Sequence, residues 1–282
     1  MYQLRAPAPA LRPFIEHYWF VDAEDGPVDI RVDVFVDARA DLVFNAGAPY
    51  LREVIGGART EHRRANLDAQ RLVPIRIVQR GDVRIAGVRF HLGGLGPFCR
   101  GALRPWTGKT PDPIEVFGDD ALVLERDLAQ RSTIDAHAQR LDAFFLQRLV
   151  LDEPHARFRR ALAHLSAADG NAGVTEVAAA AGVSQRHADR LFARYLGIAP
   201  KTVGRVLRFQ RALRALMRDP GVALAEVAAQ AGYFDHAHFI KDFRRMSGGV
   251  PRGYRGYYPP DAPSHFAPNV VVFLQDKPGR KA

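Results

Sequence analysis

The sequence predicts an α+β protein of two domains: a β-barrel or jelly-roll-like domain with flanking helices, then an all-α domain with two helix-turn-helix units joined by a long helix. Three observations predict this fold class. The 282 residues suit two domains of roughly 100–200 residues each. Short β-branched and aromatic runs occur in residues 1–118, and a duplicated helix-glycine-helix pattern fills residues 155–258. We therefore expect domains over 1–152 and 155–258 and a proline-rich tail over 259–282.

The first domain is predicted to consist of short strands separated by turns. β-branched and aromatic residues favour strands, and the runs that carry them are 32–36, 40–44, 76–78 and 83–90. Short strands that alternate with glycine-containing turns are typical of a β-barrel or jelly roll. Leucine and phenylalanine then recur at helical spacing over 119–150, which predicts two amphipathic helices that close the domain.

Each later element up to residue 258 is predicted to be a helix. The expected helices are 158–166, 175–181, 185–196, 202–218, 224–231 and 236–246. Glycine and proline, which stop helices, separate them. We place the junction between the domains at Asp152-Glu153-Pro154. In the tail, the apolar run 270–274 is expected to add an edge strand.

The helical domain contains an internal repeat. The sequence Glu-Val-Ala-Ala at 176–179 returns at 226–229, an offset of 50 residues. Beyond the turn the offset becomes 51, which pairs Phe192 with Phe243. The extra residue falls in the second turn. Two copies in register indicate a duplicated structural unit.

Each copy has the features of a helix-turn-helix unit. Gly182 and Gly232 end an alanine-rich helix in the left-handed conformation, and Ser184 and Asp235 are suited to cap the next helix. The DNA major groove admits one such helix. A connecting helix over 202–218, about 25 Å long at 1.5 Å per residue, suits groove openings about 34 Å apart. A helical bundle with a duplicated hairpin would show the same pattern.

The positive charge of the chain is concentrated in the helical domain. Residues 155–258 hold 17 Lys and Arg against 7 Asp and Glu, a net charge of +10, whereas residues 1–154 carry a net charge of −2. A basic domain fits either a solvated surface or a polyanionic partner. Because the charge coincides with both helix-turn-helix copies, it favours double-stranded DNA as the partner.

The residues of the second copy resemble a family signature. Residues 232–245, followed by Pro251, Tyr254 and Arg255, resemble the C-terminal signature of the AraC/XylS family of transcription regulators. Residues 174–200 resemble the first helix-turn-helix of that family. The resemblance implies a sequence-specific regulator that places two recognition helices in adjacent major grooves. It also implies RNA polymerase as a partner if the protein is an activator.

The resemblance further implies which residues face DNA. The candidates for base contact are Gln185, Arg186, Asp189 and Arg190 in the first recognition helix and His236, Ala237, His238 and Lys241 in the second. The candidates for phosphate contact are Arg205, Arg208, Arg244, Arg252 and Arg255. Ala237 departs from the family, which often has a small polar residue there, and can touch a thymine methyl. Asp189 either reads a base or pairs with an arginine, and His238 is either structural or faces phosphate. With its two arginines, the first helix is expected to supply more base readout.

The first domain resembles, with less specific motifs, a cupin-like β-roll found before such regulators. The resemblance lies in residues 14–20, in Asp37 with 42–45, and in 87–90 with Gly93-Gly94. It implies a domain that senses a small molecule or forms a homodimer. Candidates for an effector pocket are Trp19, Phe35, Phe44 and Arg89. The alternative is that they are plain core. Arg89, which lies in an apolar strand, is the candidate for binding an anionic effector.

Other functional classes find little support in the sequence. Cys99 is the single cysteine, so neither an intramolecular disulfide nor a cysteine metal cage can form. The first domain lacks His-x-His, and no phosphate loop or Gly-x-Ser-x-Gly occurs, so we expect no metal, cofactor or catalysis. The absence of a signal peptide and of an apolar run near 20 residues predicts a cytoplasmic protein with no membrane partner. The competing hypothesis is a β-roll enzyme or ligand carrier whose helical domain serves assembly.

Overall fold

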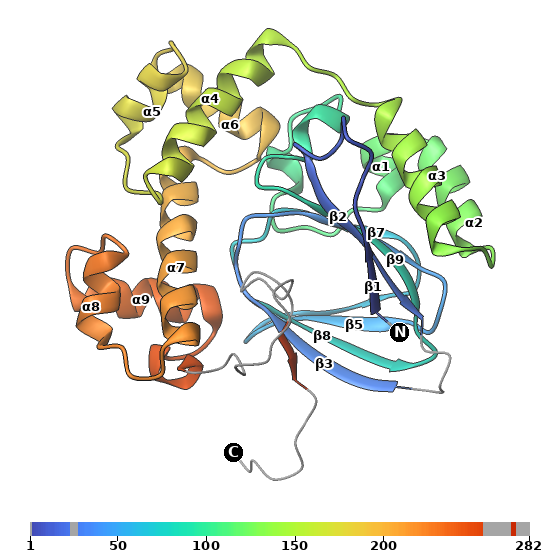
Figure 1. Ribbon diagram of the computed structural model, residues 1–282, viewed down its shortest axis with the longest axis horizontal. Helices are drawn as coiled ribbons and strands as arrows, with labels where there is room; N and C mark the ends of the chain where they lie inside the picture. Colours follow the sequence, from blue (N-terminus) through green and yellow to red (C-terminus); the bar gives the residue numbers. More distant parts are fainter. Residues whose placement is uncertain (1, 23–27, 256–271, 275–282) are drawn as a thin grey trace.

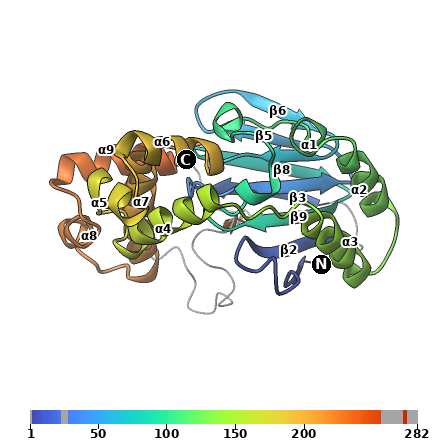
Figure 2. The same ribbon diagram turned by 90° about the horizontal axis from the view of Figure 1, so that it is seen from above.

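A β-rich half and a helical half lie side by side (Figure 1). The computed structural model describes residues 2–22, 28–255 and 272–274. The chain forms the strands first, then three helices beside them, and then crosses to the helical half (Figures 1 and 2). The predicted order of a β-rich domain followed by a helical domain is therefore confirmed.

The β-rich half contains two antiparallel sheets of five strands. The strand order is β1-β2-β9-β4-β7 in the first sheet and β10-β3-β8-β5-β6 in the second. The strands are β1 (Tyr2–Arg5), β2 (Ile15–Asp22), β3 (Val28–Val34), β4 (Asp41–Asn45), β5 (Tyr50–Val54), β6 (Arg59–His62), β7 (Asn66–Asp68), β8 (Ile75–Gly81), β9 (Arg84–Phe90) and β10 (Val272–Leu274). In the described ranges no backbone ladder joins the two sheets into a closed barrel.

Five of these strands are predicted from the sequence, and five are not. The runs 32–36, 40–44, 76–78 and 83–90 overlap β3, β4, β8 and β9. Strands β1, β2, β5, β6 and β7 are additional, because their residues form strands through pairing with neighbours rather than through a strong local pattern. The tail expected over 259–282 lies outside the described residues except for β10. This strand pairs with β3 at the sheet edge, as expected for the run 270–274.

Three helices close the β-rich half: α1 (Pro113–Phe117), α2 (Asp120–Ala129) and α3 (Ile134–Leu146). Side chains of α2 and α3 such as Leu124 and Phe145 pack with Phe44 and Phe90 on the outer face of the first sheet. The two amphipathic helices predicted over 119–150 are therefore confirmed, and α1 is an addition to them.

The helical half consists of α4 (Glu153–Ala167), α5 (Val174–Ala180), α6 (Gln185–Tyr195), α7 (Pro200–Arg218), α8 (Leu224–Gln230) and α9 (His236–Ser247). Each predicted helix coincides with one of these, and the largest difference is the early start of α4. The Asp152 carboxylate accepts the His155 N–H at 2.8 Å and caps this helix, and Pro154 is tolerated in its first turn. The residues expected as the domain junction therefore begin a helix. No helix in the described part of the chain could cross a bilayer.

Both helix-turn-helix units form as the repeat predicts. Gly182 and Gly232 end α5 and α8 with φ of 66° and 80°, in the left-handed region. The side chains of Ser184 and Asp235 accept a backbone N–H from the first turn of α6 and α9, at 3.3 and 2.7 Å. A Cβ at Gly232 would lie 2.0 Å from Oδ1 of the exposed Asn171, whose side chain can move, so it is mainly the φ of 80° that disfavours a larger residue there.

One hydrophobic core joins the two halves. Phe35, Val36 and Ala38, directly after β3, belong to the same buried cluster as the side chains of α4 to α9. The Val36 N–H donates to the Met246 carbonyl in α9 at 3.2 Å, and the Gln210 amide in α7 donates to the Val36 carbonyl. Residues 35–38 are therefore held by backbone hydrogen bonds as well as by apolar packing.

A second contact fixes the first helix-turn-helix unit to the β-rich half. The Leu103 N–H donates to the Arg194 carbonyl and the Thr107 hydroxyl to the Gly197 carbonyl, both at 2.9 Å. Gly96 packs so closely here that a Cβ would lie 2.6 Å from a backbone oxygen at the end of α6. Both units are therefore anchored on the same β-rich half.

Replacement of Phe192 by alanine should destabilise the protein. The ring is fully buried, 5.2 Å from that of Phe158, and loss of a buried phenylalanine costs about 3–5 kcal/mol through lost contacts and the remaining cavity. We expect urea unfolding to show this decrease in the free energy of unfolding. Arg186→Ala, exposed on the same helix, is the control and should change stability by less than about 0.5 kcal/mol. Equal stability of both variants would contradict this packing.

Candidate nucleic-acid interface and ligand cavity

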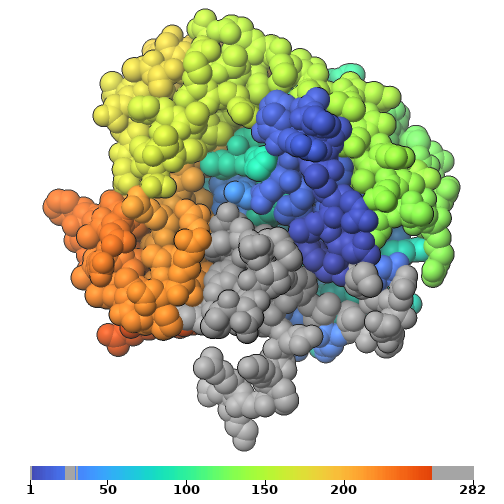
Figure 3. All heavy atoms as spheres, viewed as in Figure 1, coloured from blue at the N-terminus to red at the C-terminus, as the bar shows by residue number. Residues whose placement is uncertain are grey.

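The outer faces of α6 and α9 form the candidate nucleic-acid interface. The two helices lie near opposite ends of α7, whose 19 residues span about 28 Å at 1.5 Å per residue (Figure 1). Leu191 and Phe192 of α6 and Phe239 and Phe243 of α9 are buried. Each recognition helix is therefore held by one face, and its opposite face carries exposed residues. Figure 3 shows the helical half, in yellow and orange, beside the blue and green β-rich half.

The side chains predicted to contact bases are all exposed. They are Gln185, Arg186, Asp189 and Arg190 on α6 and His236, Ala237, His238 and Lys241 on α9. On α6 the spacing of one and four residues places its four candidates on one face. The Gln185 amide donates to the Thr175 hydroxyl of α5 at 2.6 Å. Among the described residues Asp189 forms no salt bridge with Arg186 or Arg190. The free protein therefore does not show the arginine pairing that was the alternative to base contact.

His238 belongs to a polar cluster under the second recognition helix. Its Nε2 lies 3.4 Å from Asp242 Oδ2, and its ring packs edge-on against Tyr233 with the centroids 5.4 Å apart. Asp242 is 1% exposed and accepts two hydrogen bonds from the Arg205 guanidinium. His238 therefore has a structural role in the free protein, and its exposure also leaves it accessible to phosphate.

Three of the five predicted phosphate contacts are engaged within the protein. Arg205 pairs with the buried aspartate of this cluster, and Arg208 and Arg255 each donate to a backbone carbonyl at 2.7 Å. All three side chains are half-buried, where donors need fixed partners. Arg244 and Arg252 are exposed. Phosphate contact stays a prediction for all five arginines, and exposure favours these last two.

Phe234 is an exposed apolar side chain that the sequence candidates omit. It lies in the turn before α9 and is 96% exposed. The signal that marks this place in the sequence is the extra residue of the second turn. Its ring adds an apolar group to the rim of an otherwise polar recognition surface.

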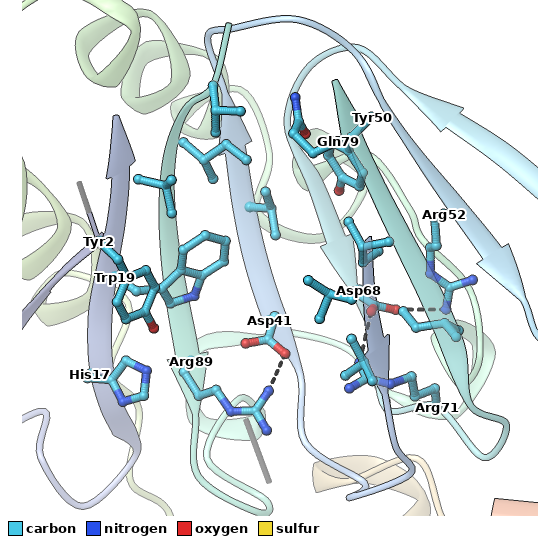
Figure 4. A pocket seen from close by; sticks show the side chains of 18 residues that line it. Tyr2, His17, Trp19, Asp41, Tyr50, Arg52, Asp68, Arg71, Gln79 and Arg89 are labelled. Atoms are coloured by element: carbon cyan, nitrogen blue, oxygen red, sulfur yellow. Dashed lines mark hydrogen bonds and ion pairs between the residues drawn. The ribbon is translucent and has the colours of Figure 1, made fainter. Parts of the chain in front are cut away.

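A cavity of about 160 Å³ lies between the two sheets of the β-rich half (Figure 4). The apolar part of its wall consists of Trp19, Val21, Val32, Val34, Val43, Ile75, Ile77, Val83 and Ile85. The Trp19 indole lies directly on the backbone of Gly87, where a Cβ would come within 2.0 Å of the ring. The polar part consists of Tyr2, His17, Asp41, Tyr50, Arg52, Asp68, Arg71, Gln79 and Arg89.

Two of the four predicted pocket residues line this cavity, and two do not. Trp19 and Arg89 do. Phe44 points the other way, toward α2 and α3, because successive residues of a strand face opposite sides and its neighbour Val43 faces the cavity. Phe35 lies beyond the end of β3, where its ring packs edge-on against Tyr254 at 5.2 Å. Phe44 and Phe35 are buried and do not line this cavity, but Phe44 lines a second cavity on the opposite side of the sheet, toward α2 and α3.

Arg89 is part of a buried row of ion pairs at one end of the cavity. Its guanidinium contacts the carboxylates of Asp37 and Asp41. The Asp68 carboxylate bridges Arg71 at 2.8 Å and Arg52 at 2.9 Å. These two groups meet where Arg71 Nη2 lies 3.8 Å from Asp37 Oδ1. Arg89 is thus neutralised by two carboxylates, which argues against its predicted role in binding an anionic effector.

The protonation states of this region follow from burial and charge. Burial acts to raise the pKa of Asp37, but Arg89 and Arg71 outweigh it, so this pKa lies below its usual value. Burial lowers the pKa of His17 to about 4, so the ring is neutral at pH 7. Asp68, Arg52 and Arg71 are absent from the sequence candidates, since only the packing of one sheet against the other brings β5 and β7 to the same cavity.

Two family models match this chain. One is described as a helix-turn-helix domain and matches residues 177–257. The other is a domain of unknown function, DUF6597, and matches residues 3–112. The first match spans both recognition helices, and the second spans the two sheets.

Several curated proteins are similar to this chain. The transcriptional activator NphR from Rhodococcus sp is 26% identical over 278 residues, which cover 89% of this chain and 73% of that protein. The HTH-type transcriptional regulator GlxA from Rhizobium meliloti (strain 1021) is 36% identical over 81 residues. That match covers 29% of this chain and about a quarter (25%) of GlxA.

The signature, the folded repeat and the relatives agree. Residues 232–245, which resemble the AraC/XylS signature, form the second turn and α9, and the helix-turn-helix model covers the same part of the chain. Among solved structures, ToxT from Vibrio cholerae is 10% identical, covers 81% of this chain and 96% of that chain, and has a TM-score of 0.44. Residues 177–257 form a helix-turn-helix domain of the AraC/XylS type, and the protein is a DNA-binding transcription regulator.

Proposed function

We propose that the regulator contacts two adjacent major grooves on one face of a duplex, with α6 in one groove and α9 in the other. The supporting observation is the matched exposure of these two helices near the ends of α7. The length of α7, about 28 Å, is close to the spacing of about 34 Å between groove openings. Assembly with another protein would favour apolar outer faces, whereas these faces carry mainly charged and polar side chains.

The two recognition helices have different roles in this proposal. Arg186 and Arg190 are suited to bidentate contacts with guanine, each worth about 1–3 kcal/mol of discrimination. On α9, Ala237 offers only a methyl group, and His238 is already bonded to the cluster beneath it. The first helix therefore supplies more of the base readout and the second more of the docking.

The β-rich half regulates DNA binding by taking up a small molecule in its cavity. The row of ion pairs lines the cavity through Arg89 and Arg71, and both contact Asp37. Asp37 directly follows Val36, which is bonded to α7 and α9. A ligand that moves this row would therefore act on the second helix-turn-helix unit. The jelly-roll classification, a homodimer, contact with RNA polymerase and a cytoplasmic location stay predictions.

Single substitutions on the recognition helices test the groove assignment. We expect Arg190→Ala to weaken binding to a selected operator by roughly five- to 150-fold, the loss of one bidentate base contact. Lys241→Ala should also weaken binding. Fluorescence anisotropy measures both affinities, and circular dichroism should show an unchanged fold because both side chains are exposed. If both variants bind the operator like the unmodified protein, the groove assignment is wrong.

The salt dependence of binding tests the phosphate contacts. The logarithm of the affinity for duplex DNA should fall steeply and linearly with the logarithm of the salt concentration, because bound phosphates release counterions. Arg244→Ala and Arg252→Ala should each lower the slope by about 1. Arg131→Ala, an exposed arginine of the β-rich half, should leave it unchanged. Absence of duplex binding even at low salt would overturn the proposed function.

Paired substitutions test the division between the helices. Arg186→Ala with Arg190→Ala should reduce the ratio of specific to non-specific affinity more than His236→Ala with Lys241→Ala does. The physical reason is that base contacts discriminate between sequences, whereas phosphate contacts do not. Competition with non-operator duplex measures this ratio. A larger loss of discrimination from the α9 pair would reverse the assignment.

A further inference from the structure

The wall of the cavity restricts the kind of molecule that fits it. Most of the wall is valine, isoleucine and the Trp19 indole, contributed by both sheets (Figure 4). Its volume is about 160 Å³. An apolar protein cavity of about 150 Å³ accommodates benzene. Size and lining therefore suit a single apolar ring with a small substituent.

The formal charges at the ionic end of the cavity sum to zero. The row contains three arginines and three aspartates: Arg52, Arg71, Arg89, Asp37, Asp41 and Asp68. Each guanidinium faces at least one carboxylate of the row. An added carboxylate or ammonium would leave one buried charge uncompensated, which costs more than its local contacts return. The balanced charges of the row therefore disfavour a charged ligand of either sign, although Arg52 Nε and Arg71 Nε are buried without an acceptor among the described residues.

The pair formed by Tyr50 and Gln79 offers a polar contact elsewhere in the cavity. These residues lie opposite one another on β5 and β8 and line the cavity together (Figure 4). The Gln79 Nε2 donates to the Ala48 carbonyl at 3.0 Å, but its Oε1 is buried and has no hydrogen-bond partner among the described residues. The Tyr50 hydroxyl accepts the Asn66 amide at 2.6 Å. A buried acceptor without a partner is destabilised until a donor reaches it.

We infer that the cavity binds a small uncharged molecule with one apolar ring and one hydroxyl or N–H group, which donates to Gln79 Oε1. This inference rests on the proposed role of the cavity as the effector site and names the class of effector. The ring lies among the aliphatic side chains and Trp19. The charges of the row stay paired with one another when the ligand shifts the row.

Three probes that share one ring and differ in charge test this inference: benzyl alcohol, benzoate and benzylamine. A ligand that binds only the folded state raises the melting temperature in proportion to the logarithm of its concentration above the Kd. With the full-length protein at pH 7, we expect benzyl alcohol to raise the melting temperature. Benzoate and benzylamine at equal concentration should not. A rise with benzoate or benzylamine that equals or exceeds the rise with benzyl alcohol would overturn the inference.

Variants locate the binding. Val43→Phe, or Val21→Phe if the first fails to fold, fills the cavity and should abolish the rise in melting temperature. Val123→Phe, on the exposed face of α2, is the matched control and should retain it. Gln79→Leu should weaken benzyl alcohol binding by roughly three- to tenfold in calorimetry, as loss of one hydrogen bond predicts. A rise that survives in both filled variants would place the ligand elsewhere and overturn the inference.

The outcomes separate this inference from the proposed function. If benzyl alcohol binds in the cavity but leaves operator affinity unchanged, the ligand class stands and the proposed regulation fails. If benzoate alone binds in the cavity and shifts operator affinity, the regulation stands and the ligand class fails. If none of the three probes raises the melting temperature, the ligand class fails, and intact operator binding shows that the proposed DNA binding does not fail with it.

Discussion

The arrangement of the whole molecule depends on the insertion of residues 35–38 into the core of the helical half. Phe35 and Val36 are buried among the side chains of α7 and α9, and both backbone groups of Val36 are hydrogen-bonded there. A packed interior tolerates little change in shape, so this insertion holds the two halves in one relation. The contact of Leu103 and Thr107 with the end of α6 adds a second anchor. Each helix-turn-helix unit therefore has its own contact with the β-rich half, in addition to its connection through α7.

This double attachment gives the two recognition helices a common support. The long helix α7 fixes their separation, and the β-rich half restrains their rotation about it (Figure 1). Two major grooves on one DNA face require both separation and orientation to be correct. A conformational change in the β-rich half would therefore alter DNA affinity by changing the orientation of the two recognition helices. It requires no contact between that half and the DNA.

The β-rich half separates its own functions by strand alternation. In β9, Arg89 faces the cavity and Phe90 faces the helices α2 and α3. In β4, Asp41 faces the cavity and Phe44 faces these helices. One side of the first sheet is thus a conventional aromatic core. The other side carries an apolar cavity ended by a balanced row of arginines and aspartates. The row is costly to bury and remains stable only because each charge has a partner.

The sequence alone determined the helical half and the class of function. The repeat, its glycines and the caps Ser184 and Asp235 act between near neighbours, so their local pattern is sufficient, and the exposed faces of α6 and α9 follow from helical periodicity. Tertiary structure decided which of the candidate arginines are hydrogen-bonded within the protein. It engaged Arg205, Arg208 and Arg255 with partners more than 30 residues away. It also decided that Phe35 and Phe44 are core and that Arg89 is neutralised, since sheet pairing and strand alternation in space bring together residues whose local sequence gives no sign of their meeting.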